Sequence, residues 1–247
     1  MNVWMKILVD DKKVLLASYL TLLNGILDAI VGVLAIGLLE LSLTAFIFSA
    51  FFIFLGLKMI SLMRNHQLDE TKRAIIACTT ISFLNSITMF THILIGSPED
   101  RVYLLSFMIF FTIVDLINFL IFYLKKIELD QMDKDDKISY FAICIIRGIG
   151  LGLLFNILGW IGWPPDPNPT MIIYNLIFGT LCLIFAERLY DKQEEKIIQI
   201  RALIVLVLGL IIGIVVCVIF PFPNTLVNII LYSLVIPIRI YYIRKKF

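Results

Sequence analysis

The residues of this sequence that could do chemistry are a few ionisable side chains inside long apolar segments. Asp28, Asp115 and Arg147 each stand within a stretch long enough to cross a lipid bilayer. A charged side chain at the centre of such a helix costs about 2.5–3.5 kcal/mol on insertion scales, so it needs a structural or functional reason. The chemistry open to these three residues is ion pairing or an ion or proton relay.

Asp115 and Arg147 are predicted to form a buried ion pair. With spans placed near residues 102–124 and 139–161, the two side chains come to about 10–13 Å from the same end of two sequential, antiparallel helices. We therefore expect them to touch, directly or through one water, in the inner half of the bundle. A pair that locks the helices together and a relay for ions or protons are both open interpretations.

Asp28 lies about 14 residues into the first span, at a depth that no Lys or Arg matches. Its expected neighbours are Asn24, one helical turn away, and Asn85 or His92 on the third span. Without a cation beside it, burial would favour the neutral carboxyl and make Asp28 a candidate proton site. A carboxylate that faces an aqueous vestibule is the alternative.

The third span is the most polar, and Ser82, Asn85 and His92 share one of its faces. A helix of this kind avoids lipid, so it is expected either at the buried centre of the bundle or along a cavity. Asn156, in the fifth span, completes the set of intramembrane polar candidates.

No catalytic motif accompanies these residues. The sequence has no GxSxG, HExxH or Walker A pattern, and its two histidines have no neighbours at ligand spacing. The cysteines lie inside apolar runs without a CxxC pair and are expected as core residues: Cys78, Cys144, Cys182 and Cys217. The sequence therefore predicts no enzyme, no metal centre and no cofactor.

The elements that must position the polar residues are membrane-spanning helices. Of the 247 residues, 60% are hydrophobic and 16% are charged, which is too apolar for a soluble domain of this size. A span needs about 20 apolar residues, and eight stretches qualify: 14–38, 43–63, 74–95, 102–124, 139–161, 170–189, 198–220 and 224–243. The runs are too long for barrel strands and lack their alternation, so the prediction is an all-α polytopic membrane protein. The first span is expected to remain in the mature chain, because no small-residue cleavage site follows it.

The distribution of basic residues predicts the topology. Of the 21 Lys and Arg residues, 17 fall near the two termini or in alternate gaps between spans, whereas the opposite gaps contain only Arg101. Because basic residues stay cytoplasmic, both termini are expected in the cytoplasm of a cell-membrane protein. Arg239, close to a cytoplasmic helix end, is expected to snorkel to the headgroups. The connection 125–139 is expected as a solvated linker, with partner docking or divalent-cation binding as the alternative.

The chain is interpreted as a single transmembrane domain, 1–247, that contains four tandem in–out–in hairpins. Related stretches begin the first helix of each hairpin about 60 residues apart, which gives pseudo-repeats at 1–65, 66–126, 127–192 and 193–247. Glycines in the fifth span are expected to let neighbouring helices pack closely. The expected partners are membrane lipids, together with a second copy of the chain or another protein, and not nucleic acid.

Two segments resemble the HdeD-like membrane proteins: GILDAIVGVLAIGLLE at 25–40, followed by a span with FLGL at 54–57, and LGLIIGIVVCVIFPFPN at 208–224. The resemblance covers under half of the chain, and the eight spans depart from the six that are typical of that family. It implies a non-enzymatic protein linked to envelope stress, acting as a scaffold or partner-binding subunit. The alternative function is a small-solute or proton-coupled transporter or channel that uses Asp28, Asp115 and Arg147.

Overall fold

The protein is an all-α polytopic membrane protein with four tandem helical hairpins. The computed structural model describes residues 11–34, 39–65, 68–95, 98–162, 169–192, 195–219 and 223–247. These contain eight helices and no strand: α2 (Lys12–Leu34), α3 (Leu39–Arg64), α4 (Leu68–Ile95), α5 (Pro98–Leu129), α6 (Lys134–Gly162), α7 (Pro169–Asp191), α8 (Lys196–Ile219) and α9 (Pro223–Lys246). Each helix is long and apolar enough to cross a membrane, which confirms the predicted fold class.

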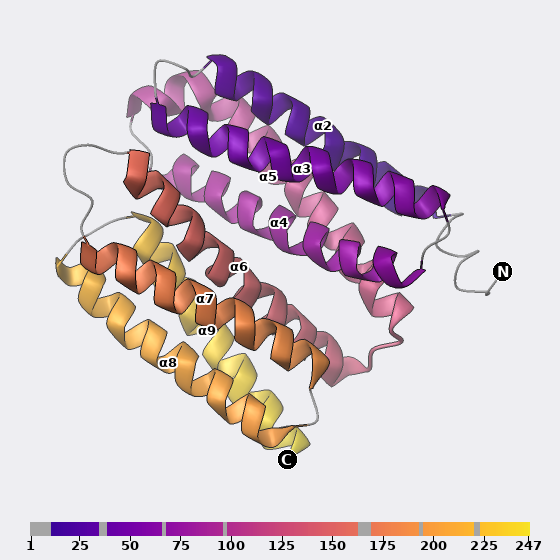
Figure 1. Cartoon of the computed structure of the whole chain (residues 1–247), viewed down its shortest axis with the longest axis vertical. Helices are drawn as coiled ribbons and strands as arrows, with labels where there is room; N and C mark the ends of the chain where they lie inside the picture. The colour runs from indigo at the N-terminus through magenta and orange to yellow at the C-terminus, as the bar shows by residue number, and fades with distance from the viewer. Residues whose placement is uncertain are drawn as a thin grey trace. The chain divides into compact units, whose positions relative to one another are not determined.

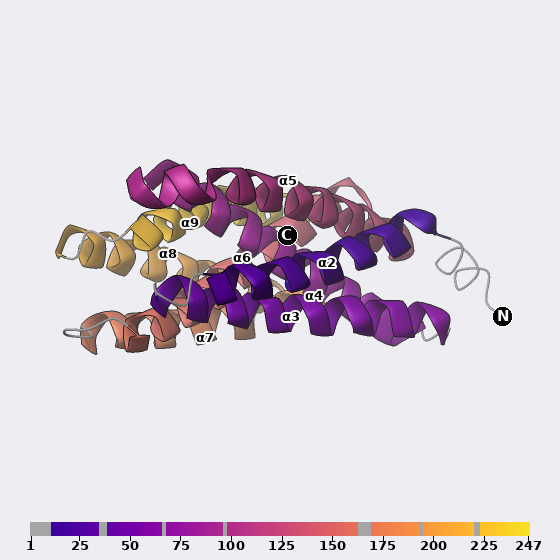
Figure 2. The same ribbon diagram turned by 90° about the horizontal axis from the view of Figure 1, so that it is seen from above.

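The chain divides into two compact units, residues 1–131 and 132–247. In the first unit, α2 and α4 each pack against both α3 and α5, which closes a ring of four helices (Figure 1). The second unit repeats this plan, with α6 and α8 each packing against α7 and α9. Within each unit the helices lie lengthwise against their neighbours (Figure 2). Each unit holds two of the predicted hairpin repeats, so we describe the chain as two four-helix units rather than one undivided domain.

The helices of both units carry apolar side chains outside and polar side chains inside. On α2 the exposed positions recur at helical spacing and are apolar or aromatic: Leu16, Tyr19, Leu23, Ile26, Ile30 and Val33. The buried polar positions of the same helix are Ser18, Thr21, Asn24 and Asp28. This arrangement suits a lipid environment, because in a bilayer only the interior of the bundle offers hydrogen-bond partners.

Glycines bring the first two helices of each unit into close contact. A Cβ atom on Gly25 of α2 would lie 2.7 Å from the backbone nitrogen of Ile53 on α3. In the second unit, a Cβ atom on Gly150 of α6 would lie 3.0 Å from the carbonyl oxygen of Gly179 on α7. The close packing expected for the glycine-rich fifth span is therefore confirmed at Gly150.

The predicted linker 125–139 is mostly helical, which corrects the expectation of a long solvated connection. Helix α5 continues to Leu129 and α6 begins at Lys134, so only residues 130–133 are outside helices. Asp133 caps α6, because its carboxylate accepts a hydrogen bond from the backbone N–H of Asp136 at 2.8 Å. That hydrogen bond lowers the pKa of Asp133. Both helices extend beyond their apolar segments, because the last turn of α5 and the first turn of α6 are polar.

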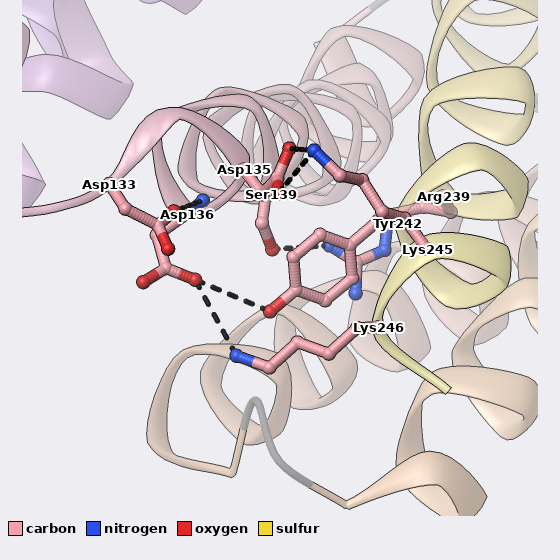
Figure 3. Close-up of polar contacts among 8 residues, drawn as sticks. All are labelled: Asp133, Asp135, Asp136, Ser139, Arg239, Tyr242, Lys245 and Lys246. Carbon is pink, nitrogen blue, oxygen red and sulfur yellow. Dashed lines mark hydrogen bonds and ion pairs between the residues drawn. The ribbon is translucent and has the colours of Figure 1, made fainter.

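Ion pairs join the first and last helices at the same end of each unit. In the first unit, Asp11, directly before α2, pairs with Lys125 of α5 at 2.7 Å. In the second unit, Asp135 of α6 pairs with Lys245 of α9 at 2.6 Å (Figure 3). The two units therefore share both a helical arrangement and an ion pair that joins their first and last helices at one end.

The stability of the first unit is expected to fall in acid through Asp11. Partial burial acts to raise the pKa of Asp11, but hydrogen bonds from Lys125 and from the backbone N–H of Val14, with the charge of Lys125, outweigh it and lower the pKa. A folded-state pKa below the unfolded value of about 3.9 stabilises the fold above that pH, and the contribution is lost as pH falls through the folded-state pKa.

Asp11→Asn tests this, because Asn also caps helices but does not titrate. The melting temperature in detergent should fall less for Asp11→Asn than for the wild type between pH 6 and pH 3. Equal losses for the two proteins would show that the Asp11 ion pair does not stabilise the fold.

Candidate functional site

A buried group of acids and amides joins three helices of the first unit. Asp115 of α5 accepts a hydrogen bond from Asn24 of α2 at 2.7 Å and another from Asn85 of α4 at 2.6 Å. Asp28 follows Asn24 by one turn on α2. We call these four residues the acid–amide cluster. All four side chains are buried, and Asp115 and Asn85 are fully inaccessible.

The acid–amide cluster contains two carboxyl groups that no basic side chain neutralises. Asp28 is 2% exposed, and its Oδ2 has no hydrogen-bond partner. It lies near enough to Asp115 for the two carboxyl groups to interact electrostatically. Among the described residues, no Lys or Arg pairs with either carboxyl group. Two anions in an apolar bundle are costly, so a proton or a cation is the species that this cluster would take up.

Polar side chains extend the cluster toward the N-terminal end of α2. Buried polar residues follow one face of α2 at intervals of three or four: Ser18, Thr21, Asn24 and Asp28. A facing set lies on α5: Asp115, Asn118 and Lys125. Asn118 donates to the Thr21 hydroxyl at 3.5 Å, and Lys125 meets Asp11 at the helix ends. We call this arrangement the polar column; it spans about 26 Å along α2.

The amides of the cluster present oxygen atoms that accept no hydrogen bond. The open acceptors are Asn24 Oδ1 and Asn85 Oδ1, and each belongs to a fully buried side chain. Their orientation follows from Asp115, because a carboxylate attracts the amide N–H groups and repels the amide oxygens. Asn118 Oδ1, on the neighbouring part of the polar column, is a further buried oxygen without a hydrogen-bond donor. The acid–amide cluster therefore has more hydrogen-bond acceptors than donors.

Several residues of this site were predicted from sequence, and others were missed. Asn24 and Asn85 were expected beside Asp28, whereas both donate hydrogen bonds to Asp115. Ser82 is buried as its face of the third span predicted, whereas the side chain of His92 lies outside the part of the chain that is described. Asn156 lies half-buried on α6 of the second unit. The missed residue is Asn118, which its spacing of three from Asp115 could have indicated.

The predicted partners Asp115 and Arg147 each contact other residues within their own units. Arg147 of α6 binds Oε1 of Glu187 on α7 through Nε and Nη2, both at 2.9 Å, and its guanidinium lies 5.3 Å from the centre of the Tyr190 ring. The depth estimate also changes: α5 runs on to Leu129, so Asp115 is about 21 Å from that helix end. The prediction rested on the cost of leaving either charge without a partner. In the structure Arg147 pairs with Glu187, and Asp115 accepts hydrogen bonds from two amides. The Asp115–Arg147 pair stays a prediction.

A double-mutant cycle tests that pair. Because each residue has partners within its own unit, we expect the losses of unfolding free energy in Asp115→Asn and Arg147→Met to add in the double variant, within about 0.5 kcal/mol. The measurement is unfolding in mixed detergent micelles. A coupling energy above about 1 kcal/mol would support the direct pair instead.

The second unit buries an arginine that was expected at the headgroups. Arg239 of α9 is 0% exposed, which contradicts the predicted snorkelling. Its Nη1 donates to Ser139 of α6 at 2.8 Å, and its guanidinium faces the Tyr242 ring, 5.0 Å from the centroid (Figure 3). Arg239 lies two turns from the end of α9, so neighbouring α6 covers it before it can reach the helix end.

Tyrosine hydroxyls and glycines also contribute to the second unit's polar interior. Tyr174 of α7 donates to the carbonyl oxygen of Gly209 on α8 at 3.1 Å, and the Cys182 thiol lies 3.5 Å from the Tyr232 hydroxyl. A Cβ atom on Gly209 would lie 2.8 Å from the Tyr232 hydroxyl, so the glycine makes room for the ring. This interior holds basic and neutral polar groups, whereas the acids are concentrated in the first unit.

These features define the class of the protein: a polytopic α-helical membrane protein with an acidic, amide-rich centre in its first four-helix unit. No protein-family model, curated protein or solved structure matches the chain.

Proposed function

We propose that the protein is a transporter or channel that moves a proton or another small cation through its first unit. The observation that carries this proposal is the placement of Asp28 and Asp115 together in the bundle interior without a basic partner. An ionisable residue inside a membrane is by default a candidate for an ion path. Asp28 would exchange the cation, and the amides of Asn24 and Asn85 would hold Asp115 in place.

The polar column supports a route to the acid–amide cluster from one side of the membrane. It leads from the Asp11–Lys125 ion pair to Asp28 through the hydroxyl and amide groups between α2 and α5. We further propose that this end of the bundle faces the cytoplasm of a cell-membrane protein, as the distribution of basic residues predicts. The Arg147–Glu187 pair belongs to the second unit and has no part in this route.

A proteoliposome flux assay tests the proposal. With a pH-sensitive dye inside the vesicles and an imposed proton or cation gradient, the wild type should give flux above that of empty vesicles. Asp28→Asn and Asp115→Asn should each reduce it at least tenfold. Asp191→Asn is the matched control, because it removes an exposed carboxylate outside the cluster, and it should retain full flux. Unchanged flux in both cluster variants would remove these residues from the mechanism.

A non-enzymatic scaffold of the HdeD-like kind is the second candidate. The observation that favours it is the hydrogen bonding of Asp115 by amides from two helices, which would serve equally well to lock α2, α4 and α5 together. On this view the cluster is structural, and lipids, a second copy of the chain or a protein partner would bind elsewhere. Absence of flux in vesicles that contain folded protein would favour the scaffold.

A further inference from the structure

We infer that the acid–amide cluster binds one monovalent metal ion of the sodium class, Na⁺ or Li⁺, between Asp28 and the surrounding amide oxygens. This inference rests on the proposed function, which leaves open the choice between a proton and a metal ion. Three observations carry it: the hydrogen bonds to Asp115, the open buried oxygens and the number of available charges.

Asp115 is the fixed anion of the cluster. Both of its oxygens accept a hydrogen bond from an amide N–H, at 2.7 Å from Asn24 and at 2.6 Å from Asn85. Both oxygens of Asp115 are thus occupied as acceptors, so neither is open to a further partner. Asp28 differs, because its Oδ2 is buried and has no partner. The open position is therefore on Asp28.

A proton alone would leave most of the cluster's oxygens without a partner. It would complete Asp28, but Asn24 and Asn85 would still each bury an amide oxygen that accepts no hydrogen bond. Each such group costs about 1–3 kcal/mol while it has no partner. A metal ion that prefers oxygen ligands contacts several of these atoms at once.

The charges favour a monovalent ion over a divalent one. The negative charge of Asp115 is directed at two amide N–H groups, which leaves one unpartnered carboxylate oxygen, on Asp28, for the ion. The remaining open oxygens belong to neutral amides. Calcium and magnesium sites instead draw on several carboxylate oxygens or on retained water. Hydrogen bonds from neutral amides do not cancel the charge of Asp115, but they occupy both of its oxygens. The ion therefore finds a single anionic ligand, which suits a monovalent ion better than a divalent one.

Thermal unfolding of the purified full-length protein in detergent, in matched concentrations of NaCl, LiCl, KCl or choline chloride, tests the inference. Na⁺ or Li⁺ should raise the melting temperature in a saturable way, by roughly 5–10 °C at a hundredfold excess over Kd, while K⁺ and choline should not. Binding of radioactive sodium should saturate near one ion per chain.

One variant and its control connect this effect to the cluster. Asp28→Asn replaces the open carboxylate oxygen with a neutral amide, and it should weaken sodium binding at least tenfold. Asn175→Ala is the matched control, since Asn175 is a buried asparagine of the second unit whose unpartnered atom is the donor Nδ2. Its sodium response should be that of the wild type.

Each other outcome overturns the inference in a distinguishable way. Proton flux without a sodium response would refute the metal site and leave the proposed function standing. Equal stabilisation by sodium, potassium and choline would show an effect of ionic strength only. Stabilisation by micromolar Ca²⁺ or Mg²⁺ in place of sodium would show a divalent site. Absence of both sodium binding and flux in the wild-type protein would refute the inference and the proposed function together.

Discussion

Asp115→Leu is expected to lower the free energy of unfolding by about 2–6 kcal/mol. The substitution removes the acceptor of two buried amide N–H groups, on Asn24 and Asn85, and each unsatisfied donor costs about 1–3 kcal/mol. Leucine has the same number and branching of side-chain heavy atoms and leaves no cavity, so the loss reflects the unsatisfied hydrogen-bond donors. The measurement is reversible unfolding in mixed detergent micelles, followed by circular dichroism.

Two controls separate this effect from general disturbance of α5. Leu116→Ala changes an exposed neighbour on the same helix, and it should change the free energy of unfolding by less than about 1 kcal/mol. Asp115→Asn keeps the side-chain shape and one acceptor oxygen, so its loss should be intermediate. A wild-type stability for Asp115→Leu would show that the acid–amide cluster does not hold the three helices together.

Gly25→Ala is expected to destabilise the protein by about 1–3 kcal/mol, although alanine is normally the better helix former by about 1 kcal/mol. The new Cβ atom would lie 2.7 Å from the backbone nitrogen of Ile53 and 2.9 Å from the carbonyl oxygen of Ser49. Backbone atoms cannot rotate away as a side chain can, so α2 and α3 would have to separate along the first hairpin.

The control for this prediction is Gly32→Ala on the same helix. There the nearest atoms belong to the Phe46 ring, at 3.2 Å, and an aromatic side chain can move by the few tenths of an ångström required. Gly32→Ala should therefore lower the melting temperature in detergent far less than Gly25→Ala. Equal effects at the two positions would mean that backbone contact between α2 and α3 does not limit the packing.

The number and type of elements could be predicted from the amino-acid sequence because lipid leaves few choices. An apolar run of about 20 residues in a bilayer must satisfy its own backbone hydrogen bonds, and the α-helix does so within one segment. The end of α5 and the beginning of α6 were each misplaced by five residues, since the last turn of α5 and the first turn of α6 are charged. Hydropathy identifies the apolar span, whereas capping residues such as Asp133 determine where a helix begins.

The candidate site was predictable as a set of residue types and not as a set of contacts. Asp28, Asn85 and Asp115 stood out because each is costly in lipid, whatever it touches. Their mutual contacts depend on the rotation of each helix about its axis and on which helices are neighbours, and an apolar sequence constrains neither. The sequence-based prediction therefore paired Asp115 with Arg147 from their depths in the membrane alone.

What the sequence determined by itself is a chain of eight membrane-spanning helices with a few polar groups that require burial. Only the tertiary structure decided how they combine. It closed the helices into two rings of four, and it brought Asn24 and Asn85 to the two oxygens of Asp115. It also enclosed Arg239 beneath Tyr242 and beside Ser139. The physical reason is that hydropathy acts on each helix alone, whereas hydrogen bonds between helices need side chains from several helices at one level and facing one another.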